Sequence, residues 1–139
     1  MKRTIHHRTD AAYSLHDMFV TAFEIKNQDV FMRTQSGMVR TTPPFDQTDG
    51  YVEFHQVDWA FSYIYIFDFV GNAGKFSGEK MFLKDFIENT EQFYFTVMDE
   101  TYGYHMTKYS GYLSLGQNLC ECIVELSHEG DMIFAEGSV

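Results

Sequence analysis

The stretch that decides the fold reads WAFSYIYIFDFV and spans residues 59–70. Side chains alternate between the two faces of a β-strand, so an extended chain here gathers the aromatic residues on one face. That face holds Trp59, Phe61, Tyr63, Tyr65, Phe67 and Phe69, and the opposite face holds Ala60, Ser62, Ile64, Ile66, Asp68 and Val70. The stretch predicts one long strand of about 33 Å, where an ordinary strand measures about 17–20 Å.

Two interpretations of the aromatic face stay open. In the first, this face is the core and the strand bends to wrap it. In the second, it is a subunit interface or a ligand platform, because large apolar patches are rarely left exposed without use. Ile64 and Ile66 on the opposite face also need cover. The middle of the strand is therefore expected to be buried on both sides.

Most of the remaining chain is rich in β-branched and aromatic residues, which suit a pleated, half-buried surface. We expect a hairpin turn at Asn27-Gln28-Asp29 and further strands over residues 19–25, 30–34, 51–57, 92–98, 104–115, 119–127 and 132–134. The sequence predicts an all-β or mainly β fold of about eight antiparallel strands. The arrangement is expected to be a β-sandwich or a partly open barrel.

One segment has helical spacing instead. Apolar side chains at Phe82, Leu83, Phe86 and Ile87 predict a short helix near residues 79–89, with Ser77 as a candidate cap. Two short matches raise the hypothesis of two similar halves: Leu15-His16-Asp17 with Leu83-Lys84-Asp85, and Gly50-Tyr51-Val52 with Gly111-Tyr112-Leu113.

Length and composition indicate one globular domain. The chain has 139 residues, of which 45% are hydrophobic and 22% are charged, as is ordinary for a globular protein. We expect residues 1–10 to be a flexible arm and residues 11–139 to be a single β-rich domain. The cysteines Cys120 and Cys122 lack the second pair that a structural zinc site needs, and we interpret them as reduced strand residues.

The charge balance restricts the partners. Twenty acidic and ten basic residues give a net charge of −10, so nucleic acid would be repelled. No apolar run approaches the roughly 20 residues that span a bilayer. The basic start, Met1 to Arg8, leads into no apolar stretch and is not a secretory signal. We expect a cytoplasmic protein that binds neither nucleic acid nor membrane.

Three groups of residues are candidates for chemistry. Gly71 to Gly78 follows a strand, but its spacing does not fit a phosphate-binding loop, and we interpret it as a connection. Histidine–carboxylate pairs raise the hypothesis of a metal site formed by His16, Asp17, His55 and Asp58. The segment Asp99 to His105 reads as a hairpin turn with Gly103 at positive φ, although its polar groups would also suit a hydrolase.

Three functions follow from these features. The first is a non-enzymatic interaction domain without a cofactor, forming a homodimer and capturing a basic protein partner. The second is a β-domain with an aromatic pocket for a small molecule such as a carbohydrate. The third is a metal-dependent enzyme. For the two binding functions, the expected ligand or interface residues are Trp59, Phe61, Tyr63, Tyr65, Tyr102, Tyr104 and His105.

Overall fold

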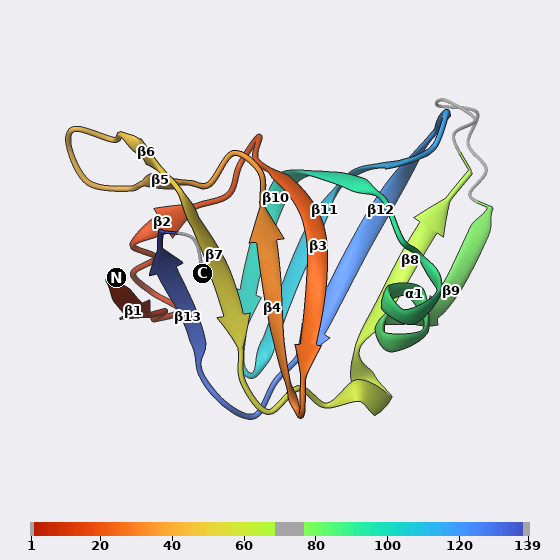
Figure 1. Cartoon of the computed structure of the whole chain (residues 1–139). Coiled ribbons are helices and arrows are strands. Elements are labelled where there is room, and N and C mark those ends of the chain that lie inside the picture. The colour runs from red at the N-terminus through yellow and green to blue at the C-terminus, as the bar shows by residue number, and fades with distance from the viewer. Residues whose placement is uncertain (1, 69–76, 138–139) are drawn as a thin grey trace.

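A computed structural model of the chain describes residues 2–68 and 77–137. Its main feature is a ten-stranded antiparallel sheet (Figure 1). In sheet order the strands are β1 (Arg3–Ile5), β13 (Met132–Glu136), β7 (Gly50–Phe54), β4 (Asp29–Thr34), β3 (Phe19–Lys26), β10 (Tyr94–Gly103), β11 (Met106–Leu115), β12 (Asn118–Ser127), β8 (Tyr63–Phe67) and β9 (Gly78–Phe82). A second, three-stranded sheet contains β2 (Tyr13–Ser14), β5 (Met38–Arg40) and β6 (Gln47–Thr48).

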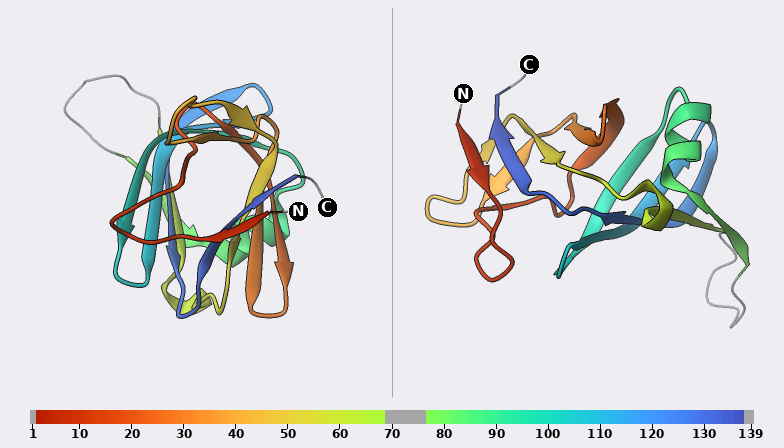
Figure 2. Two further views of the ribbon diagram at one scale, coloured as in Figure 1. Left: turned by 90° about the vertical axis from the view of Figure 1, so that its left-hand side faces the viewer. Right: turned by 90° about the horizontal axis from the view of Figure 1, so that it is seen from below.

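The large sheet curls around one core, as the end-on view in Figure 2 shows. It does not close, because β1 and β9 end the strand order without pairing with each other. The inner face contributes buried side chains from strands along its whole width, among them Val20, Phe54, Ile64, Phe95 and Leu126. The mainly β prediction and the partly open barrel are therefore confirmed. The number of strands was underestimated.

The hairpin predicted around residues 27–29 is confirmed, since β3 and β4 pair directly with Lys26 opposite Asp29. Residues 2–10, interpreted as part of a flexible arm, contribute β1, and β1 pairs with β13 from Arg3 to Ile5. Of the two matches that suggested two similar halves, Gly50-Tyr51-Val52 and Gly111-Tyr112-Leu113 both lie in strands, β7 and β11, and the other match differs in local structure. Leu15 lies between β2 and β3, whereas Leu83 begins a helix.

The single long strand over residues 59–70 is wrong at its start. Trp59–Phe61 forms a short 3-10 helix, because the Asp58 carboxylate accepts a hydrogen bond from the Ala60 amide at 3.2 Å. Ser62 then holds the turn, since its hydroxyl donates to the Asp58 carbonyl at 2.9 Å. Strand β8 covers only Tyr63–Phe67, and residues 69–70 lie outside the described residues.

The predicted helix is confirmed but begins later than expected. Helix α1 spans Leu83–Asn89, while Gly78–Phe82 is strand β9. The residue that precedes the first helical turn is Phe82, not Ser77, and it makes no side-chain capping bond. Leu83 and Phe86 bury the apolar side of α1 in the core. Tertiary packing therefore stabilises this short helix.

Candidate functional site

The outer face is the surface of β8, β10, β11 and β12 that points away from the core. Along these strands the inward positions are buried, as Ile64, Cys122 and Leu113 show. The outward positions line up in three cross-strand rows. From β8 to β10 these are Phe67, Glu121, Tyr112 and Thr96; then Tyr65, Ile123, Ser110 and Asp99; then Tyr63, Glu125, Lys108 and Thr101.

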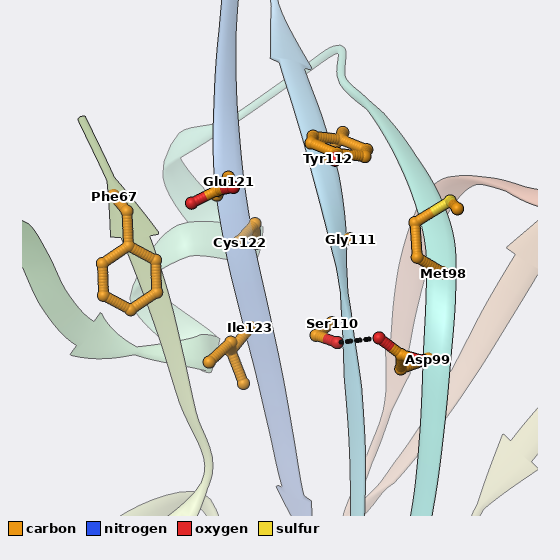
Figure 3. A pocket seen from close by; sticks show the side chains of 9 residues that line it. All are labelled: Phe67, Met98, Asp99, Ser110, Gly111, Tyr112, Glu121, Cys122 and Ile123. Carbon is orange, nitrogen blue, oxygen red and sulfur yellow. Dashed lines mark hydrogen bonds between the residues drawn. The ribbon is translucent and has the colours of Figure 1, made fainter. Parts of the chain in front are cut away.

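A hollow of about 470 Å³ opens on this face, over the first two rows. In Figure 3, Glu121 stands between the rings of Phe67 and Tyr112, and Asp99 lies beside Ser110. The hollow is lined by Phe67, Met98, Asp99, Ser110, Gly111, Tyr112, Glu121, Cys122 and Ile123. Its volume is in the range of pockets that bind small molecules in proteins.

A bulge in β10 shapes the hollow. The register between β10 and β11 shifts between Val97 and Asp99, so that Met98 has no partner. Opposite the bulge, Gly111 allows the two backbones to approach closely. A Cβ atom at this position would lie 1.8 Å from the Thr96 carbonyl oxygen. Any other residue at position 111 would push the two strands apart, and glycine in a strand often marks such a close approach.

Two carboxylates give the hollow its electrostatic character. Asp99 and Glu121 are exposed, and neither forms an ion pair with a residue in the described part of the chain. The Ser110 hydroxyl donates a long hydrogen bond of 3.4 Å to Asp99. The neighbouring Glu125, outside the hollow, is instead paired with Lys108 at 3.3 Å. The hollow thus offers two negative charges beside two aromatic rings.

A ladder of aromatic rings continues from the hollow toward β9. Tyr65 stacks on Phe67 and Tyr63 stacks on Phe82, with ring centroids 6.5 Å and 5.5 Å apart. The Lys80 ammonium lies 4.1 Å from the Tyr63 ring centroid. Because Ser62 and Ile64 are the buried residues of this segment, the aromatic residues of β8 belong to the outer face. The interpretation of the aromatic face as core is wrong.

The structure separates the residues predicted as a ligand or interface site. Tyr63 and Tyr65 lie on the outer face, and Phe61 is 61% exposed in the turn before β8. Trp59 packs against the core.

The remaining three belong to the β10–β11 hairpin. The Tyr102 hydroxyl donates to Glu100 at 2.9 Å, and burial raises its pKa. Tyr104 is exposed and lies against the His105 ring. The positive φ in this turn belongs to His105, not to Gly103 as predicted.

The residues predicted as metal ligands have other contacts. His16 lies 3.1 Å from its neighbour Asp17 on the surface. The two ring nitrogens of His55 contact Asp29 at 3.1 Å and Glu53 at 2.8 Å. Asp58 caps the 3-10 helix. In residues 2–68 and 77–137 no group of three or more histidine, cysteine, aspartate or glutamate side chains is placed to hold a metal ion.

The cysteines lie unpaired on β12. Burial raises the pKa of the Cys122 thiol to about 12, so this thiol is not an activated nucleophile. The segment from Gly71 to Gly78 is interpreted as a connection. Its residues 71–76 lie outside the described residues.

Sequence reasoning missed most of the hollow. Met98, Ser110, Glu121 and Ile123 carry no motif, and they come together only through the pairing of three strands. One signal was present in the sequence, because Gly111 interrupts an otherwise strong strand pattern and such a glycine suggests a bulge.

Comparisons with protein-family models, with curated proteins and with solved structures find no match for this chain. Among the described residues, no helix has the length and apolar character required to cross a membrane.

Proposed function

We propose that the chain is a non-enzymatic binding domain that captures a basic protein partner on the outer face. The observation that favours this function is the pair of carboxylates in the hollow, Asp99 and Glu121, without a cationic partner among the described residues. A lysine or arginine side chain of the partner would enter between Phe67 and Tyr112. There the rings would add cation–π attraction to the two ion pairs.

The overall charge supports the same choice of partner. A net charge of −10 attracts basic surfaces over a distance and speeds their encounter with the domain. The ladder of Tyr63, Tyr65 and Phe67 extends the contact area beyond the hollow. Aromatic side chains of this kind are enriched at the centres of protein interfaces. The unpaired cysteines agree with the cytoplasmic location expected from the sequence.

The test measures binding of three synthetic peptides of equal length by titration calorimetry. One alternates arginine with threonine, one alternates glutamate with threonine, and one contains only neutral residues. We expect the basic peptide alone to bind, and its affinity to fall as salt increases. Absence of binding by the basic peptide at about 1 mM, the weak end of specific association, would contradict the proposal.

A double variant locates the binding site. Asp99→Asn with Glu121→Gln is expected to weaken binding of the basic peptide by about tenfold or more, because hydrogen bonds to charged groups each contribute roughly 1.5–3 kcal/mol. The matched control is Asp85→Asn with Glu88→Gln on α1, which removes the same charge from exposed positions outside the hollow. Equal weakening by both variants would mean that only net charge matters.

A small carbohydrate is the alternative ligand, favoured by the size of the hollow and by the ring of Tyr112 beside Glu121. Glucose oligosaccharides serve as the probe. Binding that is indifferent to salt but lost in Tyr112→Ala would replace the basic partner by this alternative.

A further inference from the structure

Among the described residues, strand β9 forms an open edge of the large sheet. Gly78–Phe82 pairs with β8 on one side and ends the strand order on the other (Figure 1). Four of its five residues are exposed, and Met81 is half-buried. The opposite edge, β1, has only three residues. An unpaired edge of five residues presents backbone donors and acceptors on which another strand can add.

The usual protection of such an edge is weakened here. Natural sheets place lysine on edge strands so that its charge prevents pairing with another chain. In β9 the Lys80 ammonium lies 4.1 Å from the Tyr63 ring centroid and 5.5 Å from that of Tyr65. Its charge is therefore partly compensated by the two rings of β8. Pro is absent from β9, and its pairing with β8 runs without a bulge.

The side chains of β9 are self-complementary in one register. Suppose that two copies pair antiparallel with Met81 opposite Met81 of the partner subunit. Lys80 then lies opposite Phe82 of the partner subunit, and the two-fold axis repeats this contact with the subunits exchanged. Of the two neighbouring registers that keep both outer faces on one side, one places Lys80 opposite its own copy. The other is centred on Phe82 and would require Leu83 to pair as a strand residue, although α1 begins there. Like charges directly opposite each other destabilise a sheet, whereas a cation beside an aromatic ring stabilises it.

We propose that β9 is the docking site for a second copy of this chain, with the two β9 strands pairing antiparallel around Met81. The aromatic ladder then runs across both subunits, because Phe82 already stacks on Tyr63. The residues that line the hollow lie on β8, β10, β11 and β12, so the dimer leaves both hollows open to a basic partner. This inference does not depend on the proposed function.

The first experiment is light scattering on the wild-type chain over a range of concentrations, compared with Phe82→Lys. Phe82 is 47% exposed, and the lysine would face Lys80 of the partner subunit. We expect a wild-type dimer and a dissociation constant at least about tenfold higher for Phe82→Lys, because like charges then meet across the interface. Phe45→Lys is the matched control, since Phe45 is 60% exposed in a loop away from β9.

A second measurement uses the wild-type chain alone, in case Phe82→Lys alters the fold. Backbone amide exchange in residues 78–82 is expected to slow as concentration rises, because dimerisation buries the free edge. The double variant Asp99→Asn with Glu121→Gln is expected to dimerise normally, so loss of peptide binding and loss of the dimer are separable. A monomer at about 100 µM, or a dimer whose β9 exchange ignores concentration, would overturn the proposal.

Discussion

Carboxylates toward the two ends of the large sheet differ in their contacts with other side chains. At the end formed by β1, β13 and β7, Glu53 is buried and receives two hydrogen bonds from Arg3, at 2.7 Å and 3.1 Å, and a third contact from His55. On the outer face of β10–β12, Asp99 and Glu121 have no cationic partner in the described part of the chain. The first arrangement ties strands together. The second leaves charge available to another molecule.

The contacts at the first end also affect how its carboxylates titrate. Although burial opposes ionisation of Glu53, the hydrogen bonds from Arg3 and His55 outweigh it and hold the pKa of Glu53 below its ordinary value. Glu136, on β13, accepts hydrogen bonds from Tyr13 and Arg40, and its pKa is also lowered. Glu53 and Glu136 thus contribute to the fold at the structural end, whereas Asp99 and Glu121 in the hollow are available to another molecule.

The largest expected effect concerns the backbone beneath the hollow. Gly111→Ala places a Cβ atom 1.8 Å from the Thr96 carbonyl oxygen, so the β10 bulge must move. We expect a loss of about 2 kcal/mol or more in the free energy of unfolding, measured with urea. Gly103→Ala is the control, because the nearest atom to its Cβ is 3.7 Å away. Equal losses in the two variants would mean that the close approach does not shape this region.

Next in size is the loss of the buried carboxylate at the structural end. Glu53→Gln keeps the shape of the side chain but removes the charge that Arg3 and His55 contact. We expect a loss of about 2 kcal/mol in urea denaturation, because hydrogen bonds to charged groups contribute roughly 1.5–3 kcal/mol and Arg3 stays half exposed to water. A change within about 0.5 kcal/mol, as for an ordinary surface substitution, would abolish the distinction between the two ends.

The sequence predicted the strands better than the site. The β3–β4 hairpin follows from local alternation and a turn, which are properties of neighbouring residues. The prediction of a strand at residues 59–61 is wrong for a local reason, which the alternation of aromatic residues does not reveal. Asp58 and Ser62 bond to the backbone and turn the chain before β8 begins.

The outward direction of Tyr63 and Tyr65 depends on more distant residues. It is fixed by what packs on the opposite face, where Ile64 contacts the core. The hollow is built by the successive strands β10, β11 and β12 together with β8 from an earlier part of the chain, and the bulge at Met98 sets which side chains meet there. A periodic pattern gives the face that a residue shares with its neighbours, but not the register between distant strands.

A smaller effect is expected from pH, again at the structural end. The His6 ring packs 4.2 Å from Tyr102 and 5.6 Å from Phe134 between centroids, and its two nitrogens find no hydrogen-bond partner among the described residues. Burial lowers the pKa of His6, and the nearby His7 and His128 act in the same direction. The folded chain then binds a proton less readily than the unfolded chain does.

Stability is therefore complete above the unfolded pKa of about 6.5 and falls as the pH drops below it. His6→Phe keeps a ring between Tyr102 and Phe134 but cannot be protonated. We expect the melting temperature of the wild type to fall between pH 7.5 and 5.5, and that of His6→Phe to fall less, because His128 still contributes with the same sign. Identical slopes for both chains would show that protonation of His6 does not destabilise the folded state.

The smallest expected effect is the one that separates the two ends most directly. Glu121→Gln is the same substitution as Glu53→Gln, but it removes a charge that no described residue contacts through an ion pair. We expect the free energy of unfolding to stay within about 0.5 kcal/mol of the wild type, while affinity for the basic peptide falls. A loss of stability comparable to that of Glu53→Gln would make Glu121 a structural carboxylate and remove the main support for recognition at the hollow. If the free energy of unfolding is unchanged while peptide binding weakens, the charge of Glu121 serves the partner. The fold then gains nothing from this charge, so contacts within the chain do not account for its presence.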